Sequence, residues 1–163
     1  MNPHTRRRTV DWDDPAKLAA RASTMSGLDY LRGMRDGAIP HPPISLLLDF
    51  LVVEVEEGRV VFELKPAEYH YNPFSTVHGG VTCGVLDAAT GCAVHSTLPA
   101  GVGYTSIDLK VNYLRPITIE TGLLRCEGRI IQAGNRIALT EAEMIDKQGK
   151  LYAFGVSTCM VFR

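Results

Sequence analysis

Apolar residues form one long block in the middle of the chain and several shorter runs on either side of it. The block, His78–Leu98, is apolar on almost every face of a helix, a pattern typical of a helix buried on all sides. Short runs bounded by turn residues predict strands, and they occur at Asp49–Glu56, Arg59–Lys65, Gly103–Leu114, Thr121–Gln132, Asn135–Ile145 and Leu151–Phe162. This order predicts an α+β fold in which one antiparallel sheet wraps one long central helix.

The first 42 residues follow a different pattern. Asp13-Asp14-Pro15 is a typical helix start, with an acidic cap and a proline in the first turn. Residues Lys17–Arg35 then predict an amphipathic helical segment that is broken near Ser26-Gly27. We therefore divide the chain into an N-terminal helical extension, residues 1–42, and a main domain, residues 43–163.

Composition narrows the function classes. The chain has 163 residues, 45% hydrophobic and 21% charged, and a net charge of −1, which is typical of one soluble globular domain. Near-neutral charge argues against nucleic acid as a partner, and we expect the basic cluster Arg6-Arg7-Arg8 to be a solvated tail. No run reaches the roughly 18 apolar residues that cross a bilayer, so no membrane partner is expected.

Cysteines and histidines are spread along the chain. The four cysteines form no CxxC pair, and the five histidines show no metal-ligand spacing. The polar start of the chain lacks the apolar run of a secretory signal. We expect a cytoplasmic protein with reduced thiols, no metal site and no cofactor.

His78-Gly79-Gly80 lies where the central helix begins. The first N–H groups of a helix lack partners within the helix, and the helix dipole favours negative charge there. Two glycines let a ligand oxygen approach the backbone closely. The motif therefore suits a carbonyl that becomes an oxyanion during a reaction.

Asp87 is an acid within the apolar block. Such a carboxylate is costly unless it is paired or functional, and the residue alone fits either a structural Asp bonded to a neighbouring chain or buried water, or a catalytic group. Gly84 and Gly91 lie on the same side of the helix and leave room for a substrate or for another chain. His78 and Asp87 point to opposite faces about 13 Å apart along the helix. If both act on one substrate, a symmetric dimer with composite sites is the simplest arrangement.

Five short motifs together resemble the hotdog-fold acyl-CoA thioesterases, and most closely the PaaI-like branch named after the phenylacetate pathway. They are Asn72-Pro73, Val77-His78-Gly79-Gly80, Leu86-Asp87, Thr105-Ser106-Ile107-Asp108-Leu109 and Tyr113-Leu114-Arg115-Pro116. The resemblance runs from about Pro43 to Phe162. It implies the hotdog fold for the main domain.

The resemblance also implies roles for individual residues. Asp87 would act as general base or nucleophile, and the N–H of Gly79, from the other subunit, would polarise the thioester carbonyl. Asn72 would position the water or the carbonyl. His78 would orient the loop and the thioester.

A hydroxyl on the following strand would assist the water, and the motif leaves Thr105 and Ser106 as alternatives. Three positions depart from the family pattern. Ser75 and Asp49 stand where relatives often have glycine, and Gly91 stands where some relatives place a hydroxyl.

The implied substrate is an acyl- or aryl-CoA thioester, with coenzyme A as part of the substrate rather than a cofactor. Its phosphates call for nearby cations. The candidates for substrate binding are Gly80, Gly84, Gly91, Arg115, Arg129 and Arg136. The resemblance also implies a homodimer, further paired as a dimer of dimers.

Other functions stay open at this point. A non-catalytic hotdog protein that binds acyl-CoA or an aromatic ligand would need Gly79 but not Asp87, so the presence of both Asp87 and Asn72 favours catalysis. A hotdog-fold dehydratase would need a histidine base paired with an acid in another arrangement. A purely structural oligomer would have no use for Asp87.

Overall fold

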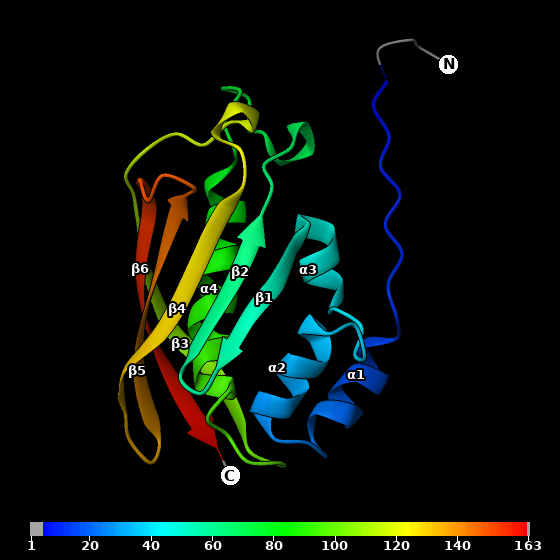
Figure 1. The fold of residues 1–163 in the computed structure, drawn as a ribbon, viewed down its shortest axis with the longest axis vertical. Coiled ribbons are helices and arrows are strands. Elements are labelled where there is room, and N and C mark those ends of the chain that lie inside the picture. The colour runs from blue at the N-terminus through cyan, green and yellow to red at the C-terminus, as the bar shows by residue number, and fades with distance from the viewer. Residues whose placement is uncertain (1–4, 163) are drawn as a thin grey trace.

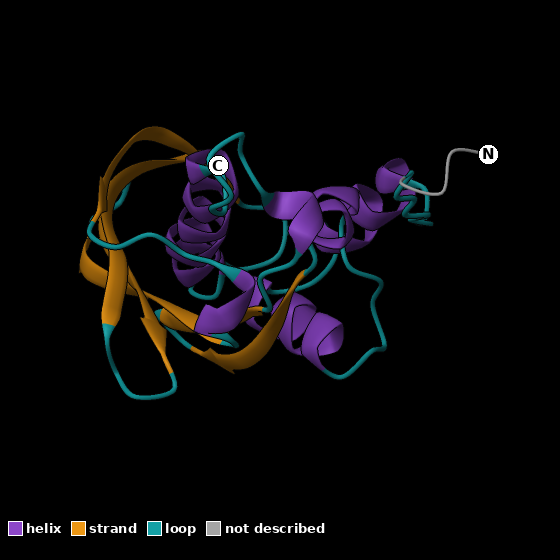
Figure 2. Ribbon diagram, turned by 90° about the horizontal axis from the view of Figure 1, so that it is seen from above, coloured by secondary structure: helices purple, strands orange, loops and turns teal. Residues whose placement is uncertain are grey.

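The computed structural model describes residues 5–162; residues 1–4 and 163, which the predicted domain boundaries include, lie outside the described residues. One curved sheet wraps the long helix α4, and the N-terminal helices lie beside strand β1 (Figures 1 and 2). The helices are α1 (Pro15–Ala22), α2 (Gly27–Arg35), α3 (Pro43–Leu48) and α4 (Gly79–His95). The strands are β1 (Phe50–Glu56), β2 (Arg59–Leu64), β3 (Gly103–Tyr113), β4 (Leu124–Ala133), β5 (Ile137–Asp146) and β6 (Leu151–Phe162).

The six strands form one antiparallel sheet in the order β1-β2-β4-β5-β6-β3, so β1 and β3 are its edges. This confirms the predicted α+β architecture and the hotdog fold. Strand β4 begins three residues later than predicted because Ile119–Thr121 forms a 3-10 turn. The Thr121 hydroxyl closes that turn by accepting the N–H of Thr118 at 3.0 Å.

Helix α4 packs into the concave face of the sheet. Its side chains Val85, Leu86 and Ala89 are fully buried. The close approach depends on Gly128 of β4, because a Cβ atom there would lie 2.2 Å from the carbonyl oxygen of Ala89. Among the described residues, no helix is both long and apolar enough to cross a membrane.

In its described part, residues 5–42, the N-terminal extension contains two helices separated at the predicted break. Ser26 caps α2 by accepting the N–H of Asp29 at 3.1 Å, which explains why the helical pattern is interrupted there. Leu31 and Met34 of α2 are buried in the same apolar core as α4 and the sheet. The extension is therefore packed onto the main domain through a shared core.

Arg8 contradicts the expectation that the basic cluster is a solvated tail. Its guanidinium donates to the carbonyls of Leu46 at 2.8 Å and Leu47 at 2.6 Å, at the end of α3. The same group lies 4.1 Å from the ring centre of Tyr69. Free carbonyls at a helix end attract cations, so Arg8 fastens the segment before α1 to the main domain.

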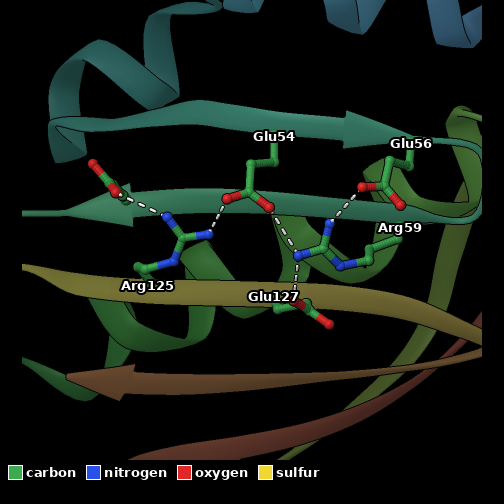
Figure 3. Close-up of polar contacts among 6 residues, drawn as sticks. Glu54, Glu56, Arg59, Arg125 and Glu127 are labelled. Carbon is green, nitrogen blue, oxygen red and sulfur yellow. Dashed lines mark hydrogen bonds and ion pairs between the residues drawn. The ribbon is translucent and has the colours of Figure 1, made fainter. Parts of the chain in front are cut away.

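An ion-pair network covers the outer face of β1, β2 and β4 (Figure 3). Arg59 bonds Glu54 at 2.8 Å and Glu127 at 2.7 Å, and Arg125 bonds Glu54 from the other side. Val61 lies between Glu54 and Glu127 in the strand register and is fully buried. The network therefore seals an apolar residue on the face opposite α4, while each half-exposed pair by itself contributes little to stability.

Candidate active site

The start of α4 is held in place by His78. The His78 Nδ1 accepts the N–H of Gly80 at 2.9 Å, and its carbonyl accepts the N–H of Val81 at 2.9 Å. Within residues 5–162, the N–H of Gly79 has no acceptor. The first turn of α4 therefore offers one free backbone donor at the positive end of the helix dipole.

Tyr113, which the sequence singled out only as part of a family motif and without a role, covers the other side of Gly79. Its hydroxyl donates to the Gly79 carbonyl at 3.1 Å. A Cβ atom at position 79 would lie 3.2 Å from Cζ of Tyr113. The ring therefore fixes the peptide at Gly79, and a side chain at this position would displace the ring by a few tenths of an ångström.

Asn72 organises the loop that leads to His78. Its Oδ1 accepts the N–H groups of Phe74 at 2.8 Å and Thr76 at 3.3 Å, and its Nδ2 donates to the Thr76 hydroxyl at 2.9 Å. Both ends of the amide are thus used within the loop. In this chain by itself, Asn72 holds the loop closed, and the predicted contact with water or the carbonyl stays a prediction.

Ser75 and Asp49, the two departures from glycine, share an unusual backbone conformation. They are the non-glycine residues with positive φ in the described chain, at 60° and 54° respectively. This left-handed region favours glycine because other side chains crowd the backbone there. A glycine at either position would avoid this crowding, and Asp49 is additionally held by the hydroxyl of Tyr69.

Asp87 lies on the side of α4 that faces the edge strand β3, and its side chain is exposed. The expectation that α4 is buried on all sides is therefore wrong for this face, because the sheet ends at β3 and does not cover it. Ser106 of β3 donates its hydroxyl to Oδ1 of Asp87 at 2.9 Å. Thr105 instead makes a 3.4 Å contact with the Ser106 carbonyl, since neighbouring strand residues point to opposite faces.

The small residues around Asp87 are explained by packing within the chain. A Cβ atom at Gly91 would lie 2.9 Å from Cε2 and 3.0 Å from the hydroxyl of Tyr104, and Gly91 is buried. A Cβ atom at Gly84 would lie 3.2 Å from Leu48. The space expected for a substrate at Gly91 is therefore filled by Tyr104. Gly80 is exposed at the start of α4.

Thiol and phenol groups beside Asp87 stay protonated at neutral pH. Burial raises the pKa of the Cys92 thiol to about 12. Burial, with Cys92, Cys159 and Asp87 nearby, raises the pKa of Tyr104 well above its usual range. Neither the Cys92 thiol nor the Tyr104 phenol is therefore available as a base at neutral pH.

The three candidate arginines lie in different places. Arg115 borders a pocket of about 300 Å³ that also contains Gly79 and Tyr113, and its guanidinium donates to the Leu151 carbonyl. Arg129 is paired with Glu141 at 2.7 Å on the sheet. Arg136 borders a separate pocket near Phe162. Of the three, Arg115 is the one that this chain places beside Gly79.

Gly79 and Asp87 are not brought together by this chain. They lie on one continuous α-helix, separated by about 12 Å along its axis. The free N–H of Gly79 and the Ser106-bound carboxylate of Asp87 are thus held apart on one continuous helix.

Known proteins are similar to this chain in sequence and in fold. A family model described as the thioesterase superfamily matches residues 74–153. A protein of Halobacterium salinarum, named as a possible esterase, is 32% identical over 132 residues, covering 72% of this chain and 85% of its own length. Acyl-coenzyme A thioesterase 13 of Homo sapiens is 29% identical over 108 residues, covering 66% of this chain and 76% of its own.

Solved structures agree with these relatives. A phenylacetic acid degradation-related protein from Ralstonia eutropha has a TM-score of 0.72 and 28% identity, and the match covers 80% of this chain and 98% of that one. The Escherichia coli PaaI protein shares the fold with a TM-score of 0.72 at 17% identity, over 86% of this chain and 97% of that one. The chain belongs to the thioesterase superfamily. Membership supports the hydrolysis of a thioester as its general reaction.

Proposed function

We propose that this protein hydrolyses an acyl- or aryl-CoA thioester to the free acid and coenzyme A, at sites built from two copies of the chain. The observation that carries the proposal is the exposed Asp87 carboxylate, held by the Ser106 hydroxyl at 2.9 Å on the open face of α4. A charged group on an otherwise apolar helix that is oriented by one hydrogen bond and left open to solvent is well suited to chemistry.

The carboxylate has one oxygen to spare. Oδ1 accepts the Ser106 hydroxyl, while within the described residues Oδ2 has no partner. Oδ2 can take a proton from a water molecule whose oxygen then attacks the thioester carbonyl carbon. Alternatively, Oδ2 attacks the carbonyl directly to form a mixed anhydride, which water hydrolyses. In both routes the C–S bond breaks, and the sulfur leaves with coenzyme A.

The free N–H of Gly79 supplies the second half of the chemistry. The carbonyl oxygen gains negative charge as the nucleophile attacks, and a fixed backbone donor at a helix N-terminus stabilises that charge. His78 and Tyr113 act as positioning residues, because both hold the first turn of α4 in place. Asn72 holds the loop that precedes it.

A second copy would bring the two halves together. The edge strand β3 borders the open face of α4, and Ile107 on this strand is 53% exposed. An unpaired edge strand is a natural place for another chain to associate. A two-fold axis at this edge would set Gly79 of one chain near Asp87 of the other, and the reverse, which gives two sites per dimer. Two such dimers would then associate into a homotetramer, the dimer of dimers that the family resemblance implies.

The coenzyme A part of the substrate carries negative phosphates, and Arg115 is the cation proposed to meet them. It borders the same pocket as Gly79, whereas Arg129 is already paired with Glu141. An Arg115→Ala variant is expected to raise KM for coenzyme A thioesters with little change in kcat. An unchanged KM would remove Arg115 from the binding site.

The proposed reaction is tested with a panel of coenzyme A thioesters that includes short-chain, long-chain and aromatic acyl groups. Release of free thiol is followed with a thiol-reactive dye, and the Asp87→Asn variant serves as the matched control. The proposal expects turnover by the wild type and none by the variant. Binding of the panel without any cleavage would instead identify a non-catalytic acyl-CoA-binding protein.

A further inference from the structure

Tyr104 stands at one end of the open face that carries Asp87. It lies on β3 two residues before Ser106, the residue that bonds Asp87. Its ring covers Gly91, which is one helical turn beyond Asp87 and would bring a Cβ atom to 2.9 Å from that ring. The ring therefore closes the surroundings of Asp87 in the direction of the C-terminal end of α4.

Tyr104 also lines a pocket. It has a volume of about 280 Å³, and its lining combines Tyr104 and His95 with Ala22 and Ser23 from the end of α1 and with Val102 before β3. The N-terminal extension thus forms one wall of this pocket. One side chain, that of Tyr104, borders both the pocket and the Gly91 side of α4.

The extension also holds the Tyr104 ring in position. The His95 ring meets the Tyr104 ring edge-on, with centres 5.6 Å apart, and meets the Tyr30 ring of α2 at 5.8 Å. Gly27 at the start of α2 packs so closely that a Cβ atom there would lie 2.2 Å from Cδ2 of His95. Tyr30 and Gly27 therefore support His95, and His95 supports Tyr104.

The residues that cover α4 differ on the two sides of Asp87. Towards the start of the helix, Leu48 covers Gly84, with 3.2 Å to a Cβ atom there. Towards its end, the Tyr104 ring lies over Gly91 and also lines a pocket. An acyl group that reacts beside Asp87 and extends in this second direction would meet Tyr104.

We propose that Tyr104 is the end wall of the acyl site and a specificity-determining residue, and that the N-terminal extension sets the depth of this site by holding His95 against it. The inference rests on the proposed function, since it takes the acyl group to lie beside Asp87. Wild-type protein should accordingly favour acyl groups that end before Gly91. Opening the wall should admit longer chains into the pocket under the extension.

The test compares Tyr104→Ala and Tyr104→Leu with Tyr104→Phe, which keeps the ring. The quantity is the ratio of kcat/KM for palmitoyl-CoA to that for acetyl-CoA. Since each methylene accommodated in a pocket changes discrimination by about tenfold or more, the ratio should rise at least about tenfold in Tyr104→Ala. The ratio should rise less in Tyr104→Leu, and it should stay at the wild-type value in Tyr104→Phe. His95→Ala removes the support of the Tyr104 ring, so its ratio should lie between those of wild type and Tyr104→Ala.

Binding gives a readout that does not need turnover. Non-hydrolysable S-alkyl-CoA thioethers of increasing length are titrated into Asp87→Asn protein with and without Tyr104→Ala, and the double variant should gain affinity for the long thioethers alone. The proposal is contradicted if folded Tyr104→Ala protein keeps the wild-type ratio of kcat/KM values and the double variant binds the thioethers as Asp87→Asn protein does. Wild-type protein that neither cleaves thioesters nor binds thioethers would overturn the proposed function itself.

Discussion

The start of α4, at Gly79, and its middle, at Asp87, are built in different ways. At its start, the free N–H of Gly79 depends on local features, namely the His78 cap and the loop closed by Asn72. Around Asp87, the site depends on residues distant in sequence, since Ser106 and Tyr104 come from β3. The difference teaches that the surroundings of Gly79 rest mainly on a local motif, to which Tyr113 of β3 adds a contact from a distant strand. The surroundings of Asp87 are products of tertiary packing.

Removing the charge at Asp87 should have the largest effect. Asp87→Asn keeps the size of the side chain and can still accept the Ser106 hydroxyl, but it cannot take a proton from water. We expect kcat to fall by about a thousandfold or more, with an unchanged melting temperature and oligomeric state. Activity close to the wild type in the purified variant would contradict the assigned role.

Removing the N–H at position 79 should have the next largest effect on kcat. Gly79→Pro deletes the donor, and proline is tolerated at the first position of a helix. His78 is already extended, with ψ at 135°, as a residue before proline should be. We expect kcat to fall by about a hundredfold, and circular dichroism would check that the fold is kept. A fully active Gly79→Pro variant would mean that another donor stabilises the oxyanion.

The neighbouring hydroxyls of Thr105 and Ser106 on β3 allow a matched pair of variants to be compared. Ser106→Ala removes the hydrogen bond to Asp87 and should lower kcat/KM by about tenfold. Thr105→Ala removes a hydroxyl that points away from the carboxylate, so it should change kcat/KM by less than about twofold. Equal losses in both variants would show that the effect comes from the strand rather than from the Ser106 hydroxyl.

The smallest predicted effect is on stability, and it concerns Ser75 in the loop that precedes α4. Ser75 has a φ of 60°, a conformation that costs a non-glycine residue about 1 kcal/mol. Ser75→Gly should therefore raise the free energy of unfolding by up to about that amount, as measured by urea titration. A clear loss of stability in Ser75→Gly would mean that the serine side chain contributes more than its backbone conformation costs.

Sequence pattern and the family resemblance predicted the fold and several local backbone features well. The break at Ser26-Gly27 follows from a capping serine, and the free Gly79 N–H follows from the position of the motif at a helix start. The resemblance flagged Ser75 and Asp49 as departures from glycine, and positive φ accounts for both. Each of these features depends on a few consecutive residues.

Tertiary packing explains what the sequence did not reveal. Whether Gly91 faces a substrate or Tyr104 depends on how β3 lies against α4. Arg8 is anchored by a carbonyl 39 residues away, which no local pattern reports. The choice between Thr105 and Ser106 likewise needed the orientation of a strand relative to a helix.

The most direct test of the central claim, that Gly79 and Asp87 act together across two chains, is complementation. Gly79→Pro and Asp87→Asn proteins are unfolded together and refolded, and native mass spectrometry confirms the mixed dimers. Each mixed dimer would hold one intact site of two, and random pairing makes half of the dimers mixed, so about a quarter of wild-type activity should return. If mixed dimers form and activity stays at the level of the separate variants, the two groups do not belong to a shared site and the account is contradicted.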